Sequence, residues 1–80
     1  MIDDKTREQL RLAIGENVAR LRKEKGWTQT QLAEKVGSHY VQINRIENGH
    51  QSPSVELLFL LVDALGVSAD ALRQIPLAVS

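Results

Sequence analysis

Glycine divides the sequence into short segments whose apolar residues recur at the period of an α-helix. Gly26, Gly37 and Gly66 each follow such a segment, and Asn48-Gly49 follows another. No segment alternates apolar and polar residues in the way that a half-buried strand requires. A glycine placed after a periodic segment is typical of a helix C-terminus, where a left-handed residue often completes the last turn. The pattern therefore predicts an all-α fold of five helices.

Capping signals predict where these helices begin and end. Thr28 and Gln31 have the spacing of a capping box at the start of the second helix. Either Ser38 or His39 can precede the third helix, which leaves its first residue open. The predicted helices span about residues 6–25, 28–36, 39–48, 54–65 and 68–75.

Length and composition are those of one small domain. Hydrophobic residues make up 42% of the 80 residues and charged residues 25%, as in soluble globular domains. We therefore expect residues 1–80 to form a single domain with one modest core. The acidic start of the chain precedes no apolar stretch, and no apolar run is long enough to span a bilayer. We expect a cytoplasmic protein without a membrane partner.

Residues that support catalysis or metal binding are not arranged for either task. The chain has no cysteine, which excludes a disulfide framework and a Cys-based zinc site. Its two histidines, His39 and His50, lack the spacing of metal ligands. There is no glycine-rich phosphate loop, paired-carboxylate site or favourable Ser, His and Asp arrangement. We therefore expect no enzyme, no metal and no cofactor.

The charges are unevenly distributed, although the formal net charge is zero. Between Arg20 and His50 the chain has six cations and three anions, so this middle part is positive and the flanks together are negative. A positive segment favours contact with phosphate groups, because phosphate neutralisation by Lys and Arg supplies most non-specific affinity for nucleic acid. The asymmetry alone is also compatible with an ordinary solvated surface.

A denser pattern runs from Leu21 to Leu72. Its members are Leu21-Arg22-Lys23-Glu24-Lys25-Gly26, Thr28-Gln29, Leu32-Ala33, Gly37, Ile43, Arg45-Ile46-Glu47-Asn48-Gly49, Pro53 and Ala64-Leu65-Gly66-Val67-Ser68. This pattern resembles the Cro and phage-repressor type of helix-turn-helix family, also called the xenobiotic-response-element type. The resemblance implies a lambda-repressor-like DNA-binding domain whose helix-turn-helix unit spans about residues 28–48. The sequence departs from the family at Ser38-His39, where an apolar residue and a Ser or Thr cap are usual.

The resemblance also implies roles for individual residues. Arg45 can donate two hydrogen bonds to guanine, Gln42 or Asn44 can pair with adenine, and Val41 can pack on a thymine methyl group. The expected base-reading residues are Tyr40, Val41, Gln42, Asn44 and Arg45. The expected phosphate-binding residues are Thr28, Gln29, Asn48 and His50. Without the resemblance, the outward residues of the third helix would be interpreted as a solvated face.

An ion pair is expected between the first and third helices. The resemblance pairs Arg22 with Glu47, and the helical phases agree, because each residue lies at the margin of its apolar stripe. We expect this pair to be partly buried.

The helical period also predicts which face of each helix points inward. On the fourth helix, more residues are apolar than this inward face requires. The inward residues of the first helix are Leu10, Ile14, Asn17, Val18 and Leu21. Those of the fourth are Val55, Leu58, Leu61, Val62 and Leu65, with Phe59 beside them. A second apolar face then holds Leu57, Leu60 and Ala64, and a helix that is apolar all round must be buried all round. We expect this face to form a homodimer interface; the alternative is that residues 75–79 fold back over it.

The sequence thus predicts a transcriptional regulator that binds double-stranded DNA sequence-specifically. A dimeric repressor or a restriction-modification controller acting on a palindromic operator fits best. The alternative is an antitoxin-like module whose main partner is another protein, such as a toxin.

Overall fold

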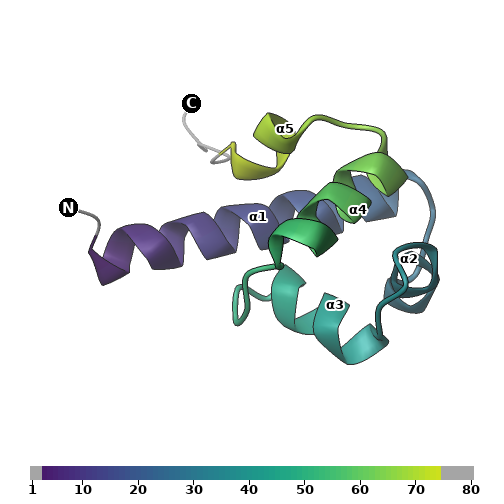
Figure 1. The fold of residues 1–80 in the computed structure, drawn as a ribbon, viewed down its shortest axis with the longest axis horizontal. Coiled ribbons are helices and arrows are strands. Elements are labelled where there is room, and N and C mark those ends of the chain that lie inside the picture. The colour runs from purple at the N-terminus through teal and green to yellow at the C-terminus, as the bar shows by residue number, and fades with distance from the viewer. Residues whose placement is uncertain (1–2, 75–80) are drawn as a thin grey trace.

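The computed structural model of the chain describes residues 3–74, and these residues form five α-helices (Figure 1). The predicted all-α fold of five helices is confirmed. The helices are α1 (Asp4–Glu24), α2 (Gln29–Lys35), α3 (Tyr40–Glu47), α4 (Val55–Leu65) and α5 (Ala69–Arg73). The expected end of the last helix near Ile75, and the expected position of residues 75–79, lie outside the described residues.

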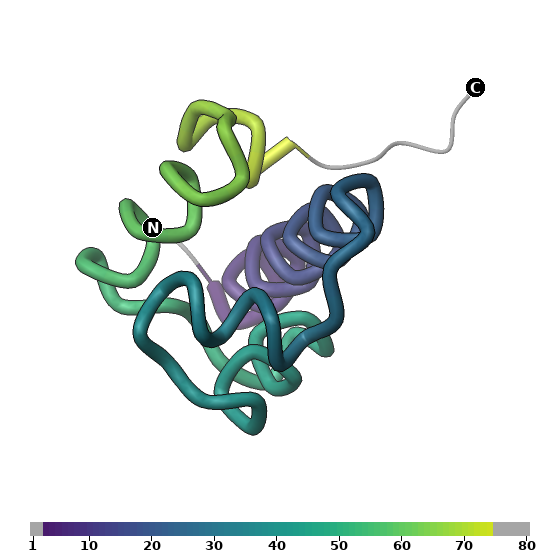
Figure 2. Tube along the Cα trace, turned by 90° about the vertical axis from the view of Figure 1, so that its right-hand side faces the viewer, coloured from purple at the N-terminus to yellow at the C-terminus, as the bar shows by residue number. Residues whose placement is uncertain are grey.

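The long helix α1 lies between α3 and α5. α3 lies on one side of it and α5 on the other, an arrangement visible both along the length of α1 in Figure 1 and nearly down its axis in Figure 2. All five helices contribute to one core, whose largest fully buried side chains are Val18, Leu32, Ile43, Ile46, Leu61 and Leu72. The pair α2–α3 is therefore packed on the same core as α4 and α5.

The capping box predicted for α2 is present. Thr28 Oγ1 accepts a hydrogen bond from the Gln31 N–H at 3.0 Å, and Gln31 Oε1 accepts one from the Thr28 N–H at 2.8 Å. These two bonds satisfy N–H groups that the first turn of a helix leaves without partners. The start of α2 is thereby fixed by local chemistry.

The start of α3, which the sequence left open, lies at Tyr40. His39 is the extended residue before it, and its side chain makes no capping hydrogen bond. The Ser38 hydroxyl instead donates to Gln42 Oε1. Neither candidate side chain therefore caps the helix, and α3 is held mainly by burial of Ile43 and Ile46.

Two backbones meet where α1 crosses the end of α3. Gly15 is buried in this crossing, and a Cβ atom there would approach the carbonyl oxygens of Ile46 and Glu47, the latter at 2.7 Å. Only glycine lets the two helices come this close. α1 thus supports the C-terminal end of α3 directly.

The inward face of α4 differs from the one expected. Leu57, expected on the outer face, is buried in the core, whereas Val55, expected in the core, is 71% exposed. The two residues lie about 160° apart around a helix with 3.6 residues per turn, so the true inward face is rotated toward Leu57. Leu60 is 46% exposed, as an outward position requires, and Ala64 is half-buried against the core.

Leu10 on α1 also departs from its expected place in the core. It is 46% exposed and lines an open, apolar pocket with Ile14, Leu58 and Leu72. Asn17 is buried as expected, and its side-chain amide donates to the carbonyl oxygens of Leu72 at 2.7 Å and Gln74 at 2.8 Å. A buried polar group is thus satisfied by the end of α5.

Candidate nucleic-acid interface

A tight turn at Gly37 joins α2 to α3. Gly37 has a φ of +67°, a left-handed conformation that glycine adopts without steric cost. The Ser38 N–H donates to the Ala33 carbonyl at 2.8 Å across this turn. Leu32 and Ala33 of α2 are buried in the core together with Ile43 of α3. Helix, tight turn and second helix form the geometry in which the second helix can enter a DNA groove.

Three of the expected base-reading residues lie exposed on α3. Tyr40 is 51% exposed and Val41 is 62% exposed, and Arg45 is also exposed. The Arg45 Nε atom donates to Gln51 Oε1 at 3.3 Å, a long contact that leaves both terminal guanidinium nitrogens free of the described residues. A guanidinium with free terminal N–H groups can donate to two acceptors at once.

The other two expected base-reading residues, Gln42 and Asn44, are half-buried and have internal partners. Gln42 accepts a hydrogen bond from the Ser38 hydroxyl, as described above. The Asn44 side-chain amide donates to Gln29 Oε1 at 3.3 Å, and the Asn44 backbone carbonyl accepts from the Asn48 side chain at 2.9 Å. The outer side of α3 therefore combines free side chains with side chains held by their neighbours.

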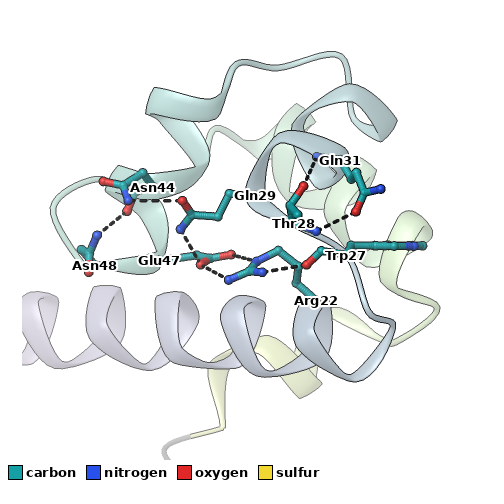
Figure 3. Close-up of polar contacts among 8 residues, drawn as sticks. All are labelled: Arg22, Trp27, Thr28, Gln29, Gln31, Asn44, Glu47 and Asn48. Carbon is teal, nitrogen blue, oxygen red and sulfur yellow. Dashed lines mark hydrogen bonds and ion pairs between the residues drawn. The ribbon is translucent and has the colours of Figure 1, made fainter.

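The expected ion pair between Arg22 and Glu47 is present and largely buried (Figure 3). Arg22 Nε donates to Glu47 Oε2 at 2.7 Å and Nη2 donates to Oε1 at 3.0 Å, so the pair is bidentate. The two side chains are 10% and 5% exposed. Hydrogen bonding to Glu47 raises the pKa of Arg22 against the opposing effect of burial. The remaining terminal nitrogen of Arg22, Nη1, donates to the Trp27 carbonyl at 2.7 Å.

Gln29 extends this ion pair toward the surface. Its amide nitrogen donates to Glu47 Oε1 at 2.8 Å, while its amide oxygen accepts from Asn44 (Figure 3). Among the expected phosphate-binding residues Gln29 is half-buried, whereas Thr28, Asn48 and His50 are exposed. Thr28 and Gln29 lie at the start of α2, and Asn48 and His50 follow the end of α3.

Residues 18–72 match the HTH_3 helix-turn-helix family. The chain belongs to this family. An uncharacterized HTH-type transcriptional regulator of Sinorhizobium fredii, y4dJ, is 41% identical over 59 residues, which are 74% of this chain and 77% of that protein. Several solved structures share the fold of this HTH_3 chain. The restriction-modification controller protein C.AhdI of Aeromonas hydrophila has a TM-score of 0.73 and 26% identity over 78% of this chain and 94% of its own. The hypothetical transcription factor NHTF of Neisseria has a TM-score of 0.79 and 30% identity, and the match covers 86% of this chain and 80% of that one.

Membership in HTH_3 confirms the predicted lambda-repressor-like helix-turn-helix fold. The protein is a DNA-binding transcriptional regulator of the helix-turn-helix type, in a family that is not enzymatic. Within residues 3–74 no group of three or more His, Cys, Asp or Glu side chains could hold a metal ion. The helices of the same residues include none that is both long and apolar enough to cross a membrane.

Ion pairing changes the charge that the middle of this HTH_3 chain offers to a partner. Arg22 is neutralised by Glu47, and Arg20 pairs with Glu24 at 3.2 Å on the surface of α1. The remaining cations are Lys23, Lys25, Lys35 and Arg45. Lys25 and Lys35 lie over the Trp27 ring, 5.5 and 4.5 Å from its centroid, so part of the positive charge sits beside the start of α2.

Three polar partners in this region were not expected from the sequence. Gln51 contacts Arg45, and Ser38 contacts Gln42. Gln29 and Asn44 contact each other. Gln51 and Ser38 lie in loops, where no helical period applies. Gln29 and Asn44 lie on different helices, so their meeting depends on how α2 and α3 cross. The period of either helix alone contains no information about that crossing.

Proposed function

We propose that this HTH_3 protein is a homodimeric repressor, built like a restriction-modification controller, that reads a palindromic operator with α3. The observation that carries the proposal is the exposure of Tyr40, Val41 and Arg45 on a helix whose other side is fixed to the core. A rigid helix with a free outer face can present side chains to base edges in the major groove. The likeness to C.AhdI supports this architecture, because it extends over 94% of that controller's chain.

Each exposed residue of α3 has a role in this proposal. Arg45 donates to guanine O6 and N7, and Val41 packs on a thymine methyl group. Tyr40, at the first position of α3, contacts the DNA where the helix enters the groove. Gln42 or Asn44 reads adenine with its side-chain amide.

The phosphate contacts lie on both sides of these base contacts. Thr28 and Gln29 bind one phosphate at the start of α2, where the first turn has N–H groups directed at an anion. Asn48 and His50 bind another after the end of α3. Contacts to phosphate fix the position and orientation of the protein on the duplex and carry no sequence information directly.

The proposed homodimer forms through the outer face of α4. Leu60 and Phe59 are exposed on this face, with Ala64 at its edge and α5 beside it. A two-fold contact brings the same patch of both subunits together. Such a dimer would hold its two α3 helices about 34 Å apart and match half-sites one helical turn apart. A dimer bound across an operator keeps other proteins off the same duplex, which is the simplest form of repression.

Selection of bound sequences from random duplex DNA tests this function. We expect enrichment of a palindrome whose half-sites are centred about 10 to 10.5 base pairs apart. Sedimentation of the free protein is expected to show a dimer. A recovered site without two-fold symmetry contradicts the dimeric mode. Failure to enrich any sequence contradicts DNA reading altogether and would favour the antitoxin-like alternative, with a protein such as a toxin as main partner.

A further inference from the structure

A chain of hydrogen bonds leads from the buried Glu47 carboxylate to the outer side of α3. Glu47 Oε1 accepts from Gln29 at 2.8 Å, and Gln29 Oε1 accepts from Asn44 at 3.3 Å (Figure 3). Glu47 is itself held by Arg22 of α1. Three helices therefore contribute to the position of one side chain, Asn44.

The chemistry of these groups permits only one assignment of donors and acceptors along this series of hydrogen bonds. An ionised carboxylate accepts hydrogen bonds and donates none, so Gln29 must turn its amide nitrogen toward Glu47. This turns the amide oxygen of Gln29 toward Asn44. An oxygen can only accept, so Asn44 must turn its own amide nitrogen toward Gln29. The buried negative charge thus determines which end of the Asn44 amide is the donor.

Asn44 has hydrogen-bonding capacity left after this contact. One N–H of its amide nitrogen and the side-chain oxygen have no hydrogen-bond partner among residues 3–74. A neighbouring donor and acceptor on one amide match N7 and the N6 amino group of adenine in the major groove. Because the Gln29 contact holds the amide, less side-chain freedom is lost when the base is bound.

We propose that Glu47, acting through Gln29, sets the amide direction of Asn44 and makes Asn44 a specificity-determining reader of adenine. The inference rests on the proposed function, since it requires that α3 read DNA. Gln29 is then a positioning residue as well as a phosphate contact. Its second amide N–H remains available for the phosphate.

Operator variants that replace each base pair in turn test this role. The proteins compared are wild type, Asn44→Ala, Gln29→Met and the double variant. Gln9→Met is the matched control, because Gln9 is exposed on α1 and makes no side-chain hydrogen bond to the described residues. We expect Asn44→Ala and Gln29→Met each to lose about tenfold preference for adenine at the same base pair. The double variant should lose no more preference than Asn44→Ala, and Gln9→Met should behave as wild type.

Other results would overturn the inference. One is a Gln29→Met protein that binds all sequences more weakly but keeps its adenine preference, since Gln29 would then contact phosphate only. Another is unchanged preference in Asn44→Ala, or loss of preference at two different base pairs in the two single variants. If Gln29→Met does not fold, Gln29→Ala is measured in its place. A wild-type protein that prefers no sequence would instead refute the proposed function itself.

Discussion

At the scale of single residues, Glu47 combines a buried side chain with a negative charge. Its side chain is 5% exposed, and its carboxylate accepts hydrogen bonds from Arg22 and Gln29. An ion pair in such surroundings adds little net stability over an apolar pair, because both charges have lost their hydration. Removal of one partner is a different matter, since the other charge then stays buried and uncompensated.

Arg22→Ala and Glu47→Ala should therefore each lower the free energy of unfolding by about 3 to 5 kcal/mol. The double variant should lose less than the sum of the two single losses, because it leaves no orphaned charge. Chemical denaturation of the four proteins measures these differences. Glu24→Ala is the control, since its pair with Arg20 is exposed and should contribute well under 1 kcal/mol. Losses below about 0.5 kcal/mol in both single variants would mean that the pair is exposed in solution.

A second prediction at this scale concerns Gly15, where we expect a change in stability opposite in sign to the one that helix propensity predicts. Replacing glycine by alanine inside a helix normally stabilises by up to about 1 kcal/mol. At Gly15 the new methyl group would meet the Ile46 and Glu47 carbonyls, which are backbone atoms and cannot rotate away. We expect Gly15→Ala to destabilise the protein by about 1 to 3 kcal/mol, as measured by thermal unfolding. Glu16→Ala, at an exposed neighbour, should change stability by less than about 0.5 kcal/mol. A stabilised Gly15→Ala protein would show that α1 and α3 lie farther apart.

At the scale of elements, the outer face of α3 and the loop after it should respond differently to substitution. Arg45→Ala should weaken binding to the preferred site by about 1 to 3 kcal/mol and relax the preference at one base pair. His50→Ala should weaken binding to all sequences alike, because a phosphate contact does not distinguish bases. Binding curves on matched and singly mismatched duplexes separate the two effects. Unchanged discrimination in Arg45→Ala would remove this residue from the base-reading set.

Elements whose signals are local could be predicted from the sequence, whereas faces that depend on neighbouring elements could not. The start of α2 follows from Thr28 and Gln31, whose spacing alone defines a capping box. On α4 nearly every residue is apolar, so periodicity allowed more than one inward face, and Leu57 was assigned to the wrong one. Leu10 has the correct helical phase and shares a pocket with Leu58 and Leu72, but these neighbours leave it 46% exposed.

In the candidate site, too, some features could be predicted from local signals, and others depend on how the helices pack. Exposure of Val41 and Arg45 follows from the period of α3, which places Tyr40 only at the flank of the outer face. The pair between Arg22 and Glu47 came from the family resemblance, and helical phase agreed with it. The contact between Gln29 and Asn44 depends on the crossing of α2 and α3, which no spacing within either helix determines.

At the scale of the whole molecule, α1 lies between α3, which we expect to face DNA, and α5, which lies beside the proposed dimer face. α3 lies on one side of α1 and α5 on the other (Figure 2). Buried contacts tie both to α1, through Gly15 toward α3 and through Asn17 toward α5. A dimer formed through α4 and α5 would therefore hold α3 in a defined orientation, because a tightly packed core transmits position from one side to the other.

The outer face of α4 decides whether this arrangement exists. Leu60 and Phe59 are exposed there, and the helical period places the exposed Glu56 and Asp63 between them, so the face combines apolar and acidic side chains. A glutamate at position 60 would place a charge in the centre of the proposed two-fold contact, opposite its own copy. We expect Leu60→Glu to be monomeric in sedimentation at concentrations where wild type is dimeric, with a similar unfolding temperature because Leu60 lies outside the core. Its affinity for a palindromic operator should fall strongly, while a single half-site should be bound as by wild type. Gln9→Glu adds the same charge at an exposed position on α1 and should leave both properties unchanged. A wild type that stays monomeric at high micromolar concentration, or a Leu60→Glu protein that dimerises and binds normally, would show that the subunits do not meet through α4.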